Sequence, residues 1–160
     1  MPTCTVDILQ IIRVPMWLRE CQTLLPAGFP SPPADDPGTR VNLNDILLPN
    51  PESTYLARVR GNSMDGPPSH ITDGCLMAVD CSLTPQPGHI VVAAIDGEFT
   101  VKRLEKRGPH YWLVPDNPDH PATDLSLLGR DFEVWGVVTH VITEMISGKL
   151  TAHVRTRHLQ

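Results

Sequence analysis

A serine and a lysine in this 160-residue chain have, together, the groups needed to break a peptide bond. Ser63 lies in the run Gly61-Asn62-Ser63-Met64, and Lys102 closes a strand-like run further along the chain. A serine hydroxyl attacks a carbonyl carbon when an uncharged lysine accepts the hydroxyl proton. Upstream of both, Ala27-Gly28 joins two small residues at the start of a proline-rich segment. A nucleophile, a general base and a candidate scissile bond in one chain predict a protein that cleaves itself.

The strand expected around Lys102 determines where the lysine side chain points. Side chains alternate between the two faces of a strand, so Thr100 and Lys102 share one face. Val101 and Arg103 share the other. Packing against the neighbouring strand 90–95 is expected to remove the Lys102 amine from water. Because burial disfavours the ammonium form, it lowers the pKa of a lysine from about 10.4 toward neutrality, as a general base requires.

Other interpretations of these residues stay open on the sequence alone. Taken singly, Ser63 is typical of a turn and Lys102 of a strand surface. A Ser-His-Asp arrangement is spatial and needs no fixed spacing, so a histidine competes with Lys102 as the base. The seven histidines are His70, His89, His110, His120, His140, His153 and His158. None stands at metal-ligand spacing, so neither a metal nor a cofactor is predicted.

Short alternating runs separated by turn residues predict a mainly β body. Asp96-Gly97 indicates a two-residue hairpin, because both central positions favour positive φ. A short helix is expected over 41–48, where Pro49 ends it. The expected strands are 55–60, 76–79, 90–95, 98–104, 111–114 and 132–146.

Composition and the candidate scissile bond together divide the chain into four segments. The first holds a weakly amphipathic stretch over 6–18 that Pro15 interrupts. The second is rich in proline, which favours extended backbone and cannot bury enough apolar surface to fold. The predicted segments are an N-terminal arm (1–27), a tether (28–40), a compact β domain (41–146) and a flexible polar tail (147–160).

Charge and hydropathy exclude several classes of function. The net charge is −5, which disfavours a direct, non-specific grip on nucleic-acid phosphates. The longest apolar run, 90–95, is too short to cross a bilayer, and no secretory signal is visible at the N-terminus. Four cysteines without close pairing predict reduced thiols. A cytoplasmic protein that does not contact membranes is therefore expected.

Several motifs occur in the same order in a known family. They are Gly28-Phe29-Pro30, Gly61-Asn62-Ser63-Met64, Asp73-Gly74, Val79-Asp80, Gly88-His89-Ile90-Val91-Val92-Ala93, the run 96–104 and Gly136-Val137-Val138. Together they resemble the self-cleaving Ser/Lys peptidases related to the LexA repressor, and most closely the UmuD mutagenesis proteins. The resemblance runs from about Gly28 to Met145. The chain departs from the family at Asn62, where an acidic residue is common, and in a longer loop after Met64.

The resemblance implies a compact peptidase domain of curved antiparallel sheets behind an extended N-terminal arm. It implies Ser63 as nucleophile, Lys102 as general base and Ala27-Gly28 as the bond cut. It further implies a bacterial, cytoplasmic homodimer whose cleavage is stimulated by a RecA–single-stranded DNA filament in the DNA-damage (SOS) response. The shortened dimer would then serve as accessory subunit of an error-prone Y-family translesion polymerase.

Three alternatives belong to other classes. A LexA-type repressor needs a DNA-binding domain before the tether, where only a short arm precedes Ala27 and the overall charge is acidic. A signal-peptidase-like enzyme shares the Gly-x-Ser-Met motif but needs an apolar membrane anchor. A non-catalytic interaction module would keep the fold without needing Ser63, Lys102 and Ala27-Gly28 together.

Overall fold

The computed structural model describes residues 6–9, 17–20, 39–129 and 132–146. The predicted scissile bond Ala27-Gly28 lies outside these residues, as do the predicted tail and most of the predicted tether. The boundaries of the arm, the tether and the tail therefore remain predictions.

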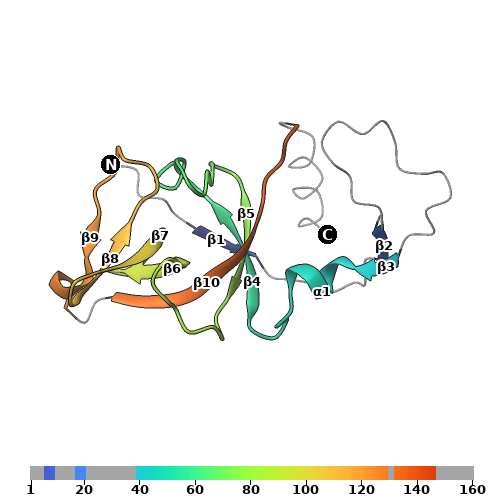
Figure 1. The fold of residues 1–160 in the computed structure, drawn as a ribbon, viewed down its shortest axis with the longest axis horizontal. Helices are drawn as coiled ribbons and strands as arrows, with labels where there is room; N and C mark the ends of the chain where they lie inside the picture. Colours follow the sequence, from blue (N-terminus) through green and yellow to red (C-terminus); the bar gives the residue numbers. More distant parts are fainter. Residues whose placement is uncertain (1–5, 10–16, 21–38, 130–131, 147–160) are drawn as a thin grey trace.

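The body is a strongly curved antiparallel sheet (Figure 1). Eight strands lie in the spatial order β1-β4-β5-β10-β6-β7-β8-β9. The strands are β1 (Val6–Leu9), β4 (Thr54–Val59), β5 (Leu76–Asp80), β10 (Phe132–Ile142), β6 (Ile90–Ile95), β7 (Glu98–Arg107), β8 (His110–Val114) and β9 (Thr123–Asp124). A 3-10 turn, η1 (Leu125–Leu127), follows β9. The predicted mainly β fold is confirmed.

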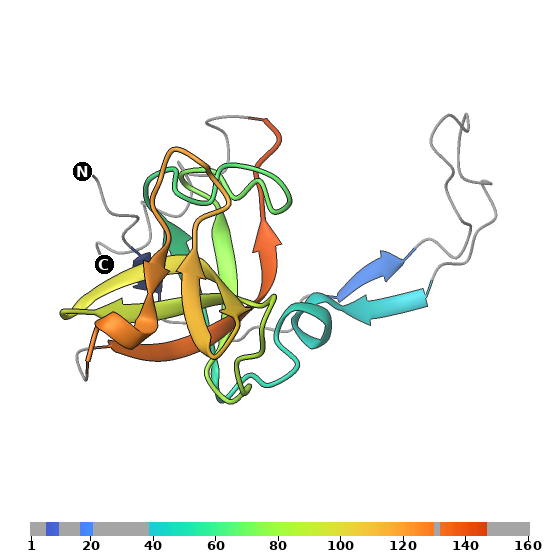
Figure 2. The same ribbon diagram turned by 60° about the vertical axis from the view of Figure 1, so that its left-hand side comes forward.

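A second, two-stranded ribbon pairs β2 (Trp17–Glu20) with β3 (Thr39–Asn42). The short helix α1 (Leu43–Leu47) follows β3 directly, and its first turn is capped by the Asn42 side chain, which accepts from the backbone N–H of Asn44. Figure 2 shows this ribbon projecting from the body through α1.

β10 bends the sheet because it is shared between two groups of strands. Its first half pairs with β6 and its second half with β5, with register shifts near Gly136 and Thr139. At Gly136 an added Cβ would lie 2.7 Å from Val79 Cγ1, so only glycine permits the close approach of β10 to β5. The resulting curvature lets one sheet enclose apolar side chains in the manner of a small barrel.

Two clusters of buried side chains form the core. The first contains Val59, Met64, Ile71, Met77 and Val101, among others. The second is built from Val91, Ala93, Leu104, Leu113 and Val137. Val101 and Leu104 of β7 stand three positions apart and therefore face opposite sides of the strand, so β7 contributes to both clusters.

The strands expected in the body are confirmed, with small shifts at their ends. At the β6–β7 hairpin, Asp96 has φ of 51° and Gly97 has φ of 81°, as the Asp-Gly signal predicts. The expected helix is shorter than 41–48, because residues 41 and 42 belong to β3. The stretch 6–18, expected only to be weakly amphipathic, instead contains β1 and the start of β2. β1 pairs with the edge strand β4, so part of the predicted arm joins the main sheet.

Candidate active site

Ser63 lies on a tight turn that leaves β4. Gly61 has φ of 92° and donates its N–H to the Asp73 carboxylate at 2.7 Å. This hydrogen bond ties the start of the Ser63 turn to the residues just before β5. Beyond Ser63, Met64 is fully buried and accepts a hydrogen bond from the Ile71 N–H at 3.0 Å. The turn is therefore anchored on both sides, and Ser63 itself is only 2% exposed.

Lys102 approaches Ser63 from the middle of β7. Its Nζ lies 2.8 Å from Ser63 Oγ, 2.8 Å from Thr100 Oγ1 and 3.0 Å from the Val101 carbonyl oxygen. On the neighbouring strand, the fully buried Val91 pairs directly with Lys102. The expected alternation is confirmed, because Thr100 and Lys102 meet on one face while Arg103 binds Asp116 on the other.

The contacts of Lys102 with Ser63 and Thr100 are at hydrogen-bond distance whether the amine is charged or uncharged. A neutral amine donates two N–H groups and accepts one hydrogen bond, whereas an ammonium only donates. The Val101 carbonyl oxygen can only accept, and the Thr100 hydroxyl is able to accept. When the amine is uncharged, the Ser63 hydroxyl can donate its proton to the Nζ lone pair, which lies 2.8 Å from Ser63 Oγ. The geometry is thus suited to proton transfer from Ser63 to Lys102.

A loop after β8 holds the Ser63 turn from a third direction. The Asn117 N–H donates to the Ser63 carbonyl oxygen at 3.0 Å, and Asn117 Nδ2 donates to the Asn62 carbonyl oxygen at 2.9 Å. His120 Nε2 lies 2.9 Å from Asn62 Oδ1. The sequence-based prediction of the site included no residue of this loop. Its Asn-Pro and Asp-rich sequence is typical of a turn, which predicts its shape but not its contact with Ser63.

The loop is fixed in turn by an ion pair from β7. Arg103, adjacent to Lys102, donates two hydrogen bonds to Asp116, at 2.9 and 2.7 Å. Burial alone would raise the pKa of Asp116, but hydrogen bonds from Arg103 and Ser69 outweigh it and hold the pKa below its ordinary value. The Asp116 side chain is 3% exposed, so the pair is largely removed from water. One strand therefore positions both the candidate base and the loop that holds the candidate nucleophile.

The backbone of the turn also offers hydrogen-bond donors. Within the described part of the chain, the N–H groups of Ser63 and Met64 have no acceptor. Unpaired backbone donors beside a nucleophile are the groups that stabilise an oxyanion during acyl transfer. The site therefore contains a hydroxyl, an amine and free N–H donors within one turn and one strand.

The histidines in the described part of the chain do not reach Ser63, and His153 and His158 lie outside it. Among the described residues, no hydrogen bond joins a histidine to the Ser63 hydroxyl. No group of three or more His, Cys, Asp or Glu side chains in the same residues is placed to hold a metal ion. No helix of the described ranges is long and apolar enough to cross a membrane.

Two contributors to the site were not among the predicted site residues. Thr100 contacts the Lys102 amine, and its place two residues earlier on the same strand face was the available signal. Asn117 contacts the Ser63 turn across a long sequence separation, and no local pattern reports such a contact. The predicted bond Ala27-Gly28 lies outside the described residues, so its position relative to Ser63 remains a prediction.

A curved antiparallel sheet that brings a buried serine hydroxyl to a lysine amine is typical of serine peptidases that cleave their own chain. The family model "Peptidase S24-like" matches residues 21–139. The chain therefore belongs to the S24 family of peptidases, and the resemblance to LexA and UmuD proteins is confirmed.

Curated relatives support the same assignment. Protein MucA of Salmonella typhimurium is 41% identical over 135 residues, which cover 84% of this chain and 88% of MucA. Protein SamA of the same species is 40% identical over 128 residues, covering 80% and 84%. The LexA repressor of Acidithiobacillus ferrooxidans is 41% identical over 100 residues, covering 61% of this chain and 48% of the repressor. MucA and SamA belong to the UmuD family of SOS mutagenesis proteins, so these likenesses support a function in the SOS response and a self-cleaving serine peptidase in general.

Proposed function

We propose that this protein cleaves its own chain at Ala27-Gly28, with Ser63 as the nucleophile and Lys102 as the general base. The observation that carries the proposal is the 2.8 Å contact between Ser63 Oγ and Lys102 Nζ in a largely buried site. Family membership supports the reaction type, and the small residues at the proposed bond suit a narrow site.

The proposed reaction has two acyl-transfer steps. Lys102 Nζ accepts the Ser63 hydroxyl proton while Ser63 Oγ forms a bond to the Ala27 carbonyl carbon. The tetrahedral intermediate collapses, the bond to the Gly28 nitrogen breaks, and Lys102 returns the proton to that leaving amine. A water molecule then gives a proton to Lys102 and attacks the ester carbon, the bond between Ser63 Oγ and the acyl group breaks, and Lys102 returns the proton to Oγ. The products are the Ala27 carboxylate, a new N-terminus at Gly28 and the regenerated Ser63 hydroxyl.

The biological role follows from the same relationships. In the proposed sequence of events, a RecA–single-stranded DNA filament stimulates cleavage during the SOS response. The shortened protein then serves, in the bacterial cytoplasm, as accessory subunit of an error-prone Y-family translesion polymerase. The likeness to MucA and SamA over most of the chain supports this role.

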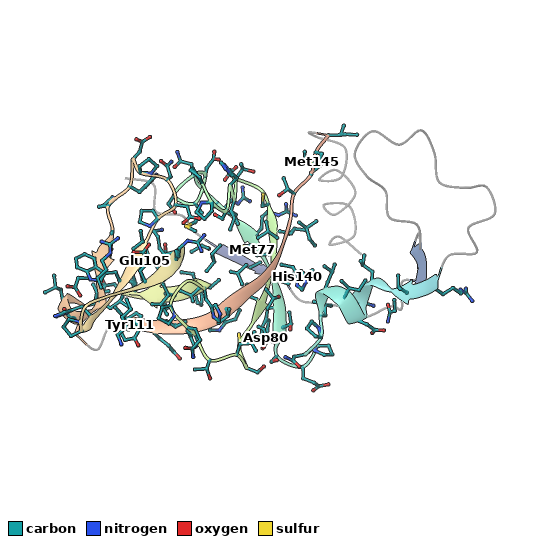
Figure 3. The ribbon with its side chains drawn as sticks, viewed as in Figure 1. Met77, Asp80, Glu105, Tyr111, His140 and Met145 are labelled. Atoms are coloured by element: carbon teal, nitrogen blue, oxygen red, sulfur yellow. The ribbon has the colours of Figure 1, made fainter. Side chains whose placement is uncertain are left out.

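The proposed assembly is a homodimer. Apolar side chains are exposed at the end of β10 and just beyond it: Val141 is 38% exposed, Ile142 39%, Met145 88% and Ile146 66%. Figure 3 shows Met145 at the edge of the body, beyond the end of β10. Large exposed apolar side chains grouped in one segment favour contact with another protein surface. Sedimentation equilibrium tests the dimer, and a monomer at micromolar concentration would contradict it.

Intact mass spectrometry tests the cleavage. Incubation with a RecA filament and nucleotide is expected to yield a species that begins at Gly28, absent in Ser63→Ala and Lys102→Ala. Raising the pH to about 10 is expected to speed cleavage without the filament, because it deprotonates a larger fraction of lysine amines. Equal resistance of the wild-type and Ser63→Ala chains under both conditions would contradict the proposal.

A further inference from the structure

We propose that Asn117 is a positioning residue that aims two backbone N–H groups of the Ser63 turn at the oxyanion of the reaction. The inference rests on the proposed function, since it assigns a role within that same site. Asn117 touches neither the Ser63 hydroxyl nor the Lys102 amine in any hydrogen bond of the described residues. The hydrogen bonds that Asn117 makes to the Ser63 turn all go to backbone carbonyl groups of that turn.

The two contacts grip consecutive peptide groups. Asn117 Nδ2 donates to the Asn62 carbonyl oxygen at 2.9 Å, and the Asn117 N–H donates to the Ser63 carbonyl oxygen at 3.0 Å. In a planar trans peptide, the C=O of one residue and the N–H of the next point in opposite directions. Holding the Asn62 and Ser63 carbonyl groups toward the loop therefore turns the N–H groups of Ser63 and Met64 away from it. These are the two N–H groups that have no acceptor within the described residues.

The orientation of the Asn117 amide is determined by its neighbours. Its Oδ1 accepts the Asp119 N–H at 3.0 Å, so Nδ2 must be the atom that faces the Asn62 carbonyl oxygen. Asn117 is 8% exposed, which makes each of these hydrogen bonds costly to lose. An isosteric aspartate would keep the acceptor toward Asp119 and lose the donor toward Asn62.

The position of Asn117 is itself constrained. The neighbouring Asp116 carboxylate is held by two hydrogen bonds from Arg103 on β7 and by one from the Ser69 N–H at 3.3 Å. On the other side, an added Cβ on the buried Gly66 would overlap the Asp116 carbonyl oxygen, so the loop and the turn are in close contact. The loop that carries Asn117 is thus anchored to β7, the strand that carries Lys102. The N–H donors of the Ser63 turn and the candidate base therefore keep a fixed relative position.

Self-cleavage rates of Asn117→Asp and Asn117→Ala, measured by intact mass between pH 7 and pH 10, test the inference. Each variant is expected to lower the rate about 10²-fold, the usual effect of losing one oxyanion donor or of a small misplacement. The pH at which the rate is half-maximal is expected to stay at its wild-type value, because the base is unchanged. Rates are expressed per folded molecule from a parallel thermal melt. If Asn117→Asp does not fold, Asn117→Ser takes its place, since serine is too short to reach the Asn62 carbonyl oxygen.

Gln86→Glu is the matched control. It makes the same amide-to-carboxylate change at an exposed position of the loop between β5 and β6, where no hydrogen bond of the described structure uses the side chain. Its rate is expected to equal the wild-type rate. Wild-type rates per folded molecule for the Asn117 variants would overturn the inference and leave the proposed function standing.

A small serine reagent separates oxyanion binding from docking of the cleavage segment. With a fluorophosphonate, Ser63 Oγ forms a bond to phosphorus, fluoride leaves, and the hydroxyl proton passes to Lys102. The Asn117 variants are expected to be labelled more slowly by a factor similar to their cleavage defect. Slow cleavage with wild-type labelling would overturn the inference. A wild-type chain that neither cleaves nor reacts would overturn the proposed function itself, and the inference with it.

Discussion

Two turns of the main sheet, one at Asp80 and one at Ser63, bury their side chains to a similar extent but differ in how many of their polar groups are hydrogen-bonded. Asp80 is 1% exposed and Ser63 is 2% exposed. The Asp80 carboxylate accepts four hydrogen bonds, from Asn50 Nδ2 at 2.7 Å, from Ser53 Oγ at 2.9 Å, and from the backbone N–H and hydroxyl of Ser82 at 2.8 and 2.7 Å. Three of these hydrogen bonds go to Oδ1 and one goes to Oδ2, so both oxygens of the carboxylate have partners within the fold.

The Ser63 turn keeps groups available that the Asp80 turn has used. Its hydroxyl meets only an amine that is able to exchange a proton with it, and two adjacent N–H groups lack acceptors within the described residues. A turn whose polar groups are hydrogen-bonded within the protein has nothing left to bind a substrate. A turn with unpaired donors can bind the developing oxyanion of a substrate. The two turns therefore separate stability from chemistry within one fold, and substitutions in each should have different effects.

Removing the Lys102 amine is expected to have the largest effect on cleavage. Lys102→Met keeps the apolar stem and should lower the self-cleavage rate by about 10³-fold or more, because no other base contacts Ser63 in the described residues. The free energy of unfolding should fall by only about 1 kcal/mol, because the buried Thr100 hydroxyl and Val101 carbonyl lose a donor while methionine removes the cost of burying an amine. Cleavage is measured by intact mass and stability by urea titration.

The control for this substitution lies on the same strand. Lys106→Met removes an exposed amine from the same face of β7 and should leave the cleavage rate unchanged. Near-normal cleavage in Lys102→Met would mean that the Ser63 turn does not use its open groups as we propose.

Removing the Asp80 carboxylate should lower the stability of the fold and leave the cleavage rate nearly unchanged. Asp80→Ala removes the buried acceptor shared by Asn50, Ser53 and Ser82. Because water can reach the exposed Asn50 and Ser82 donors, the free energy of unfolding should fall by about 2 kcal/mol, the usual contribution of hydrogen bonds to a charged group. The cleavage rate per folded molecule should stay close to wild type. Glu98→Ala, an exposed carboxylate at the start of β7, is the control with unchanged stability. A cleavage defect that persists after correction for folding would show that the two turns are coupled.

The sheet was predictable because its signals are local. Alternation of apolar side chains predicts the strands of the body, and Asp96-Gly97 predicts its tightest hairpin. The strands β1, β2, β3 and β9 were missed because none of them has more than four residues. Such short strands form only because a partner strand is present, and periodicity over four residues carries little information.

For the candidate site, too, the sequence predicted some contributors and missed others. The contact between Ser63 and Lys102 agrees with the prediction, although the prediction needed family motifs to join two residues that are far apart in sequence. Asn117 was missed because its role depends on two backbone carbonyl groups, and backbone acceptors are present at every residue. Sequence types indicate which side chains can react, whereas the groups that hold a turn in place emerge only from the fold.

Acid should weaken the Asp80 turn over a defined pH window. Burial alone would raise the pKa of Asp80, but hydrogen bonds from Ser82, Asn50 and Ser53 outweigh it and lower the pKa from 3.8 to about 2. A carboxyl whose pKa is lower in the folded state stabilises the fold above its unfolded pKa and loses that contribution as the pH falls through the folded value. Stability should therefore fall between about pH 4 and pH 2.

Urea titrations at a series of pH values check this dependence. Asp116, whose pKa is also lowered, contributes to the same window, so Asp80→Asn should reduce the slope without abolishing it. An identical slope in Asp80→Asn and wild type would show that the filled network does not depend on the ionised carboxylate.

An exposed ion pair separates the effect of filled hydrogen bonds from the effect of burial. Arg107 donates two hydrogen bonds to Glu105, at 3.1 and 2.9 Å, but the two side chains are 48% and 35% exposed. Because water competes for both charges, a double-mutant cycle of Glu105→Gln and Arg107→Gln should give a coupling energy below about 0.5 kcal/mol. The cycle is needed because Arg107 also lies 5.1 Å from the Trp112 ring centroid, a contact that a single substitution would remove as well. A coupling as large as the loss expected for Asp80→Ala would mean that filling the hydrogen bonds, rather than burying them, stabilises the Asp80 turn.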